Sequence, residues 1–407
     1  MREWQRNTLL GTVVAGLMLG VPALGLTPGA GTPQAQVAPQ ADGELPEPDP
    51  DCSTDIARRY VAGGDGVVHP AKDTDEEHSS KTDRYPDKLL EKLQETPGPW
   101  CEYNTMDEVT TGSTMTVTTD QYQDDGNPTQ QSQAHSLRPT LITLTLGRDN
   151  SGIQQHVTTC MDQIRDHNFL QANACALAVL AAQPAWDKLE EDLADILGKY
   201  KTQMDGNPNL VVAVTGYFNP YPSALDVTTK IPGFCAKLVD TIPTCTLRWV
   251  LLPPALVVLD QVVKKLNTTI EGVVDQFEIN SRGRYFFVNP YDKFKDHCMT
   301  FKVKIETKVY HPTNTVDQHD SDQDFGCSTT WIDDDGDTSN FPPVYLMPAV
   351  NGVLIYFAQT TTKMGLYPNA EGHKCIASLI YEAKTDDGLL LKNKLNIPEA
   401  AEDPEDC

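Results

Sequence analysis

The chain has 407 residues, of which 39% are hydrophobic and 22% are charged, a composition typical of globular proteins with a sizeable core. Its 57 acidic residues outnumber its 32 basic residues, which gives a formal net charge of −25 at pH 7. Such a surface repels nucleic-acid phosphates and anionic lipids, so we expect neither nucleic acid nor a membrane surface as the partner.

The N-terminus has the pattern of a secretory signal peptide. Two arginines precede an uncharged apolar stretch that runs from residue 9 to residue 26, and a small-x-small cleavage site ends at Gly25. A membrane anchor is the alternative, because this stretch approaches spanning length, but several glycines and Pro22 interrupt it. We therefore predict a signal peptide over 1–25, an extracellular location, and no stable membrane insertion after signal removal.

The segments at both ends of the mature chain are too polar or too irregular to form a core. Residues 26–50 are rich in Pro, Gly, Ala and Gln, which predicts a disordered linker. Residues 396–407 form a short acidic tail with two prolines. Between them we expect one domain over 51–395, with an insertion near 300–362.

Within that domain, strand-like runs alternate with helical patterns. Short β-branched or aromatic runs predict strands that are buried on both faces, at Tyr60–Ala62, Leu141–Leu146, Leu210–Thr215 and Tyr285–Val288. Apolar residues at helical spacing predict helices over Pro86–Gln94, Trp186–Tyr200 and Pro254–Phe277. This alternation predicts an α/β fold in which helices cover both faces of a parallel sheet. Such sheets bind ligands at the carboxyl ends of their strands.

Residues 300–362 break this alternation. Phe301–Val309 alternates in polarity as an exposed strand does, and we expect a polar loop from there to Asp337.

Glycine-containing turns follow two of the predicted strands, and a histidine-containing segment lies near the C-terminus. The turns are Gly63-Gly64-Asp65-Gly66 and Gly147-Arg148-Asp149-Asn150, and the later segment is Gly365-Leu366-Tyr367-Pro368-Asn369-Ala370-Glu371-Gly372-His373. In this order they resemble the Gly-Asp-Ser turn, the Gly-x-Asn-Asp turn and the Asp-x-x-His pair of the SGNH (GDSL-type) hydrolases. The resemblance extends from about Ala57 to Ala383 and is greatest to the extracellular, disulfide-bonded branch of fungi and actinobacteria. It implies a three-layer α/β/α fold with an SGNH-hydrolase (flavodoxin-like) parallel sheet.

The family's catalytic residues are replaced in this sequence. Its serine nucleophile corresponds to Gly66, its histidine base to Tyr367 and the aspartate partner of that base to Met364. The oxyanion-binding asparagine corresponds to Asp149, and Asn150 would take its place if the turn shifts by one residue. The family's glycine block falls between 104 and 112, with Glu108 or Gly112 as the equivalent position.

Two other side chains near these positions have weaker claims to a catalytic role. His373 lies six residues beyond the expected histidine, where the family often has a second, structural histidine. No shift of the alignment places a hydroxyl between Gly63 and Val67. A nucleophilic Asp65 carboxylate is the weaker alternative to a structural one.

Two functions remain open on this basis. One is a non-catalytic descendant that binds an ester, lipid or carbohydrate ligand in the family's cleft, or acts as an interaction protein. The other is an active carboxylic-ester hydrolase with rearranged catalytic residues. We expect no cofactor for either.

Ten cysteines agree with export, because cysteines oxidise outside the cell. None forms a CxxC pair, which argues against zinc ribbons and thioredoxin-like sites. Closure between neighbours in the sequence would give Cys52–Cys101, Cys160–Cys175, Cys235–Cys245 and Cys298–Cys327. Cys375 and Cys407 are then left over.

The remaining polar and aromatic clusters have ordinary explanations. Asp333–Asp337 resembles the start of a calcium loop but lacks the closing acidic residue, so we expect a solvated turn. We predict an exposed polar loop without a metal for a further acidic and histidine-rich set: His311, Asp317, His319, Asp320, Asp322 and Asp324. His69 is most simply a loop residue, and Trp249 a residue of the core or of a cleft wall.

Two features on helices or strand ends leave alternatives open. Asn267-Thr268-Thr269 is a glycosylation sequon for a eukaryotic host, with a bare helix position as the equal alternative. Three aromatic residues follow a predicted strand, Tyr217, Phe218 and Tyr221. They are most simply core or cleft wall, and contact with a sugar or an acyl chain is the weaker alternative.

Overall fold

The structure is a computed structural model. It describes residues 58–64, 84–94, 100–104, 134, 138–147, 153–165, 168–225, 227–229, 252–310, 316–332, 339–340, 354–363, 368–385, 387–397 and 407. The predicted signal peptide and linker lie outside these residues.

Parallel strands form the central sheet. Within the described part of the chain, five strands pair in the order β2-β1-β3-β4-β5, and every pair is parallel. This order is that of the flavodoxin-like doubly wound fold. The predicted α/β class and flavodoxin-like sheet are therefore confirmed. The strands are β1 (Arg58–Gly64), β2 (Trp100–Asn104), β3 (Leu141–Thr145), β4 (Val211–Thr215) and β5 (Tyr285–Val288).

The four predicted strands occur within two residues of their expected bounds. Every residue of β3 and β4 is buried, as expected for strands covered on both faces. Threonine hydroxyls in these strands are paired inside the core: Thr143 Oγ1 lies 2.9 Å from Tyr60 Oη. β2 was not predicted from the sequence.

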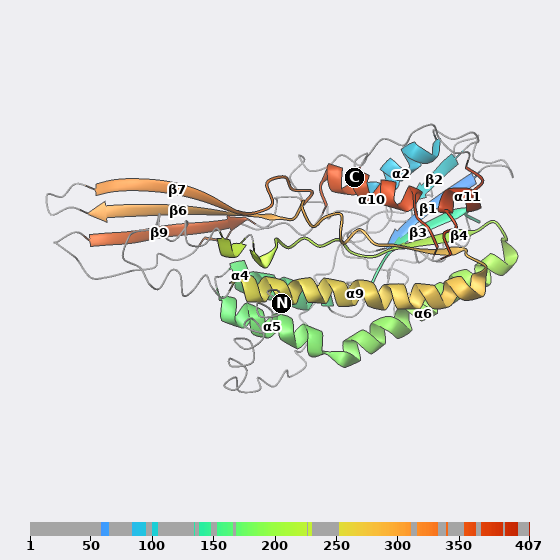
Figure 1. The fold of residues 1–407 in the computed structure, drawn as a ribbon, viewed down its shortest axis with the longest axis horizontal. Helices are drawn as coiled ribbons and strands as arrows, with labels where there is room; N and C mark the ends of the chain where they lie inside the picture. The colour runs from blue at the N-terminus through green and yellow to red at the C-terminus, as the bar shows by residue number, and fades with distance from the viewer. Residues whose placement is uncertain are drawn as a thin grey trace, which may run out of the picture. The chain divides into compact units, whose positions relative to one another are not determined.

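Helices lie on both faces of the sheet (Figure 1). On one face, the Tyr85 hydroxyl at the start of α2 lies 3.0 Å from the Thr145 hydroxyl of β3. On the other, the Tyr285 hydroxyl of β5 donates to the Leu197 carbonyl of α6 at 2.6 Å. This arrangement confirms the three-layer architecture. The helices are α2 (Tyr85–Gln94), α4 (Ile153–Arg165), α5 (Phe169–Ala181), α6 (Gln183–Gly206), α9 (Leu252–Ser281), α10 (Ala370–Tyr381) and α11 (Leu391–Lys394).

The predicted helices are longer in the structure, and the other four helices named above were missed. α9 begins with Leu252-Pro253-Pro254, since proline is tolerated in the first helical turn, where its missing N–H has no partner to lose. α4, α5, α10 and α11 were not predicted. Of these, α5 is apolar on nearly all sides rather than amphipathic. Among the described helices, none combines the length and the hydropathy needed to cross a bilayer.

A second, antiparallel sheet follows β5 in the chain. Its order is β7-β6-β9-β8, formed by β6 (Thr300–Tyr310), β7 (Val316–Gly326), β8 (Ser339–Asn340) and β9 (Leu354–Lys363). The predicted strand at Phe301–Val309 is confirmed, but the expected polar loop after it is wrong, because 316–326 forms a strand along the whole of β6. In the register of this pair, Lys302 is opposite Asp324 and Lys304 is opposite Asp322.

Three disulfides are formed by described residues. Cys160–Cys175 joins α4 to α5, and Cys298–Cys327 joins the segment after β5 to the end of β7, both as predicted. Cys375 and Cys407 are bonded to each other, so the expectation that they are left over is wrong. Cys407 is thereby bonded to α10, and Lys293 Nζ, in the segment after β5, donates to the Cys407 carbonyl at 2.7 Å. The other two predicted pairs each include a cysteine outside the described residues.

Candidate functional site

The carboxyl ends of β1 and β3 lie side by side at one edge of the sheet. Gly64, the last residue of β1, is the register partner of Thr145, the last residue of β3. After β1 the chain adds β2 on one side and then β3 on the other, so the strand order reverses between β1 and β3. Ligands of doubly wound proteins bind at such a switch point. We call this edge, formed by the ends of β1 and β3, the switch-point edge.

Glycines allow the chain to turn sharply at this edge. Gly64 and Gly147 have φ angles of 146° and 126°, a region that L side chains rarely adopt. At Gly147 an added Cβ would also lie only 3.1 Å from a Leu189 methyl carbon of α6. The turns predicted from the sequence therefore begin where the two strands end. Gly66, Asp149 and Asn150 follow them but lie outside the described residues.

A row of buried hydroxyls connects the helices to the ends of the strands. Thr145 Oγ1 contacts Tyr85 Oη of α2 at 3.0 Å and also forms a hydrogen bond with Thr215 Oγ1 of β4. Both threonines are 1% exposed, so water does not compete for these bonds. The start of α2 is thereby fixed to the end of β3.

His373 lies in the core beside this row rather than at the surface. It is fully buried in the first turn of α10, and its ring centroid lies 6.4 Å from that of Tyr85. Asn369 caps α10 by accepting a hydrogen bond from the Gly372 N–H at 3.1 Å. The start of α10 therefore lies near the end of β3, with Tyr85 between them. Met364 and Tyr367, which precede this helix in the sequence, lie outside the described residues.

The aromatic residues after β4 belong to the core. Tyr217, Phe218 and Tyr221 are each less than 5% exposed, and Phe218 stacks on Phe294 with centroids 4.7 Å apart. The simpler of the two sequence interpretations is therefore confirmed. Their burial leaves no exposed ring face on which a sugar could stack.

Asn267 is a structural residue of α9 at the same edge of the sheet. Its amide oxygen accepts from the Tyr217 N–H at 2.6 Å, and its amide nitrogen donates to the Tyr217 carbonyl at 2.7 Å and to Asn289 Oδ1 at 3.2 Å. The side chain is buried, with 3% exposed. In the folded protein the sequon is therefore inaccessible to a glycan.

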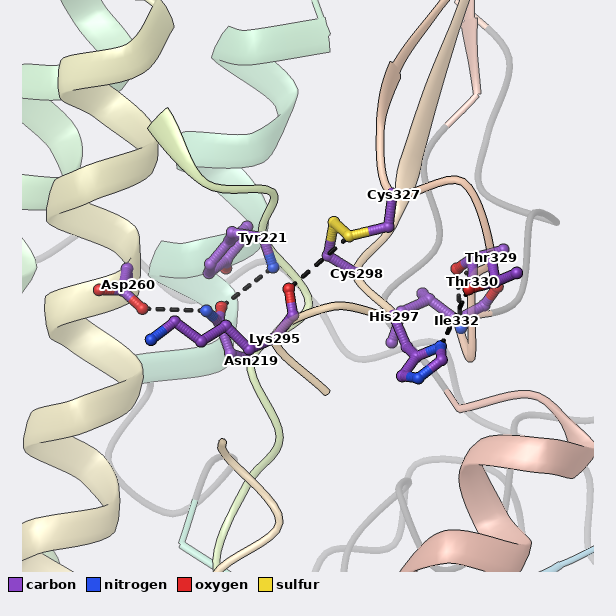
Figure 2. Close-up of a disulfide and its surroundings, with 10 residues drawn as sticks. All are labelled: Asn219, Tyr221, Asp260, Lys295, His297, Cys298, Cys327, Thr329, Thr330 and Ile332. Atoms are coloured by element: carbon purple, nitrogen blue, oxygen red, sulfur yellow. Dashed lines mark hydrogen bonds between the residues drawn. A yellow bond between two sulfur atoms is a disulfide. The ribbon is translucent and has the colours of Figure 1, made fainter. Parts of the chain in front are cut away.

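Asp260 of α9 is the centre of a polar cluster that sequence reasoning missed. Its carboxylate accepts from Asn219 Nδ2 at 3.0 Å, from Lys264 Nζ at 2.8 Å and from the Tyr291 hydroxyl (Figure 2 shows the Asn219 bond). Burial raises the pKa of Tyr291 above its usual range, and the hydrogen bond to Asp260 adds to this rise. In the sequence Asp260 is only a charge within an apolar run, and its partners other than Lys264 are 31 or more residues away.

No set of acidic, histidine or cysteine residues in the described part of the chain is arranged to hold a metal ion. Asp317, His319, Asp320, Asp322 and Asp324 lie on β7 and not in a loop, whereas His311, Asp333–Asp337, His69 and Trp249 fall outside the described residues.

No protein-family model matches the sequence, and a search of curated proteins finds no significant match. Among solved structures, the chain is similar to an extracellular lipase from Streptomyces rimosus, with 13% identity, 80% of this chain and 100% of the lipase covered, and a TM-score of 0.41. It is also similar to phospholipase A1 from Streptomyces albidoflavus, with 14% identity, 80% and 98% covered, and a TM-score of 0.37. It is similar as well to a GDSL-like lipase from Parabacteroides merdae, with 9% identity, 59% of this chain and 79% of the lipase covered, and a TM-score of 0.28.

By its strand order the chain is an α/β protein with a flavodoxin-like fold.

Proposed function

We propose that this protein is a secreted, SGNH-hydrolase-like protein that binds an ester, lipid or carbohydrate ligand at the switch-point edge and lacks the family's serine esterase activity. The observation that carries the proposal is the pairing of Gly64 with Thr145. This pairing makes the turns that contain Gly66 and Asp149 start side by side, at the edge where doubly wound folds bind ligands.

The residue types in these turns are unsuited to ester hydrolysis. A serine-type esterase needs a hydroxyl nucleophile, a base within hydrogen-bond reach and donors for the oxyanion. Gly66 has no side chain, and Asp149 as a carboxylate accepts hydrogen bonds and repels an oxyanion. Tyr367 is a poor base near neutral pH, since an ordinary tyrosine has a pKa of about 10.

Secretion is supported by the N-terminal pattern together with the disulfides. Cys160–Cys175, Cys298–Cys327 and Cys375–Cys407 all join described residues, and such bonds persist in oxidising compartments. A reducing cytosol would be unfavourable for a chain with this many cross-links.

A fluorescence titration of the mature protein tests the binding proposal. We would use cis-parinaric acid as a probe for acyl chains, with butyl butyrate and cellohexaose as competitors that represent short esters and sugars. Saturable binding of the probe is expected for the wild type, and a competitor that shares the site should displace it. Gly66→Trp should weaken probe binding at least tenfold, because position 66 follows the end of β1 by two residues and an indole is far larger than the hydrogen of glycine.

Gly206→Trp is the matched control. Gly206 is exposed at the end of α6, and nothing lies within 4 Å of a Cβ added there. This variant should bind as the wild type does. Binding that is unaffected by Gly66→Trp, or no binding of any probe to the wild type, would contradict the proposal.

A further inference from the structure

The segment Cys327–Ile332, which follows β7, is attached to the loop after β5. The Cys298–Cys327 disulfide joins them covalently, with Cα atoms 5.3 Å apart (Figure 2). Trp331 N–H donates to the His297 carbonyl at 3.0 Å, and Thr329 Oγ1 lies 3.2 Å from His297 Nδ1. The His297 ring stacks on the Trp331 ring with centroids 3.6 Å apart and an interplanar angle of 4°. A covalent bond, hydrogen bonds and a ring stack thus hold the segment at this end.

The same segment also holds the start of α10. The Asn369 N–H donates to the Trp331 carbonyl at 2.8 Å, and Asn369 Nδ2 donates to the Thr330 carbonyl at 2.9 Å. Ile332 and Pro368 form an antiparallel bridge. Backbone and side-chain bonds therefore join the segment to the two residues that precede α10.

The contact with α10 is tight enough to exclude a side chain. A Cβ added to Gly372 would lie 2.6 Å from the Trp331 carbonyl oxygen and 3.0 Å from Phe294 Cε1. Phe294 in turn packs edge-on against Trp331, with centroids 5.3 Å apart. The first turn of α10 is therefore seated directly on the segment.

We propose that Cys327–Ile332 is a disulfide-anchored clamp that positions the first turn of α10 at the switch-point edge, with Asn369 as its main positioning residue. This inference rests on the proposed function. The first turn of α10 carries His373, which lies beside Tyr85, and Tyr85 is bonded to Thr145 at the end of β3. Loosening the clamp should therefore disturb the geometry of the switch-point edge while the five-stranded sheet stays folded.

Asn369→Asp separates the clamp from the helix cap. The aspartate keeps an oxygen that accepts from the Gly372 N–H, but it loses the donor to the Thr330 carbonyl and places a negative charge beside that oxygen. Asn207→Asp is the matched control. Asn207 also accepts from a backbone N–H, that of Asn209, and donates to a carbonyl, that of Pro139 at 2.7 Å, but at the amino ends of β3 and β4.

Amide hydrogen exchange and binding of cis-parinaric acid are the two measurements, made on the full mature chain. In Asn369→Asp we expect the Trp331 and Asn369 amides to exchange at least tenfold faster, amides of β3 and β4 to be unchanged, and probe affinity to fall about tenfold. Asn207→Asp should change neither the two clamp amides nor the affinity. Unchanged exchange at Trp331 and Asn369, or an equal loss of affinity in both variants, would overturn the clamp.

Removal of the disulfide provides an independent variant should Asn369→Asp fail to fold. Cys298→Ser/Cys327→Ser should accelerate exchange of the Trp331 amide at least tenfold, whereas Cys160→Ser/Cys175→Ser should leave it unchanged. Equal exchange in the two double variants would overturn the role of the disulfide. The exchange measurements need no ligand, so they decide the clamp even if no probe binds the wild type, a result that would refute the proposed function alone.

Discussion

Replacing Asn267 with alanine removes the hydrogen bonds that hold the turn after β4. The Asn267 side chain bonds both the N–H and the carbonyl of Tyr217, and its amide nitrogen also reaches Asn289 Oδ1. With Asn267 only 3% exposed and Tyr217 only 4% exposed, solvent does not reach the Tyr217 backbone groups. The substitution therefore removes the hydrogen bonds that the Asn267 side chain makes with a buried donor and a buried acceptor.

The expected loss of stability follows from these two broken hydrogen bonds. Leaving a buried polar group unsatisfied costs about 1–3 kcal/mol. Two such groups give a decrease of up to about 2–6 kcal/mol in the free energy of unfolding. The bond with Asn289 adds little, because Asn289 Oδ1 also accepts a hydrogen bond from the Tyr291 N–H. Since domains are stable by only about 5–15 kcal/mol, this is a large fraction of the total.

Urea denaturation followed by circular dichroism measures this loss, with Asn280→Ala as the control. Asn280 lies in the same helix and donates to the Gln276 carbonyl at 2.7 Å, but it is exposed, so water replaces the bond. Its substitution should change the free energy of unfolding by less than about 0.5 kcal/mol. A loss below about 1 kcal/mol for Asn267→Ala, or equal losses for both variants, would refute the reasoning.

Three further predictions concern buried tyrosines and the tail. The Tyr200 hydroxyl is buried without a hydrogen-bond partner in the described structure, whereas the Tyr285 hydroxyl donates to an α6 carbonyl. In urea titrations Tyr200→Phe should therefore leave the free energy of unfolding unchanged or raise it, and Tyr285→Phe should lower it by about 1–2 kcal/mol. Burial raises the pKa of Tyr200, Tyr285 and Tyr291, so the unfolded chain loses these protons first. Stability should therefore be complete below pH 10 and fall above it by about 1.4 kcal/mol per pH unit for each tyrosine, and a flat alkaline profile would contradict this. Non-reducing peptide mapping should recover a Cys375–Cys407 cross-link, and either cysteine alkylated in unreduced protein would exclude it.

The central sheet was predictable because its strands are buried on both faces. In a strand such as Leu141–Thr145 every residue is buried, so the strand must be a continuous run of apolar and β-branched residues. Such a run is visible in the sequence. The strand at Tyr285–Val288 has the predicted bounds for the same reason. Glycine at the strand ends added the positions of the turns.

Other elements had no such local signal. β7 contains four aspartates and one histidine, and only its pairing with β6 makes it a strand. α5 is rich in alanine and apolar on most sides, so the periodicity of an amphipathic helix is absent. Cys375–Cys407 spans 32 residues, and its pairing depends on the path of the chain beyond α11.

The candidate site was only partly predictable. The order of the turns indicated which strand ends matter, and the register of β1 with β3 brings the residues before those turns together. The Asp260 cluster and the Trp331–Asn369 contact join segments 31 to 41 residues apart, and no spacing rule in a single sequence reports such contacts. His373 resembles a site residue by its position in the motif, but it is buried in α10, and this burial depends on tertiary packing that the motif does not report.

Labelling with a fluorophosphonate tests the central claim most directly. This reagent forms a covalent bond with an activated serine hydroxyl, and position 66, which the resemblance to the SGNH hydrolases predicts as the nucleophile position, is glycine. Intact-mass spectrometry of the mature protein should show no mass increase after incubation, and hydrolysis of 4-nitrophenyl butyrate in the same sample should equal the rate in buffer. A single stoichiometric adduct, accompanied by ester hydrolysis that the adduct abolishes, would contradict the account and show that a nucleophile elsewhere in the chain does the work.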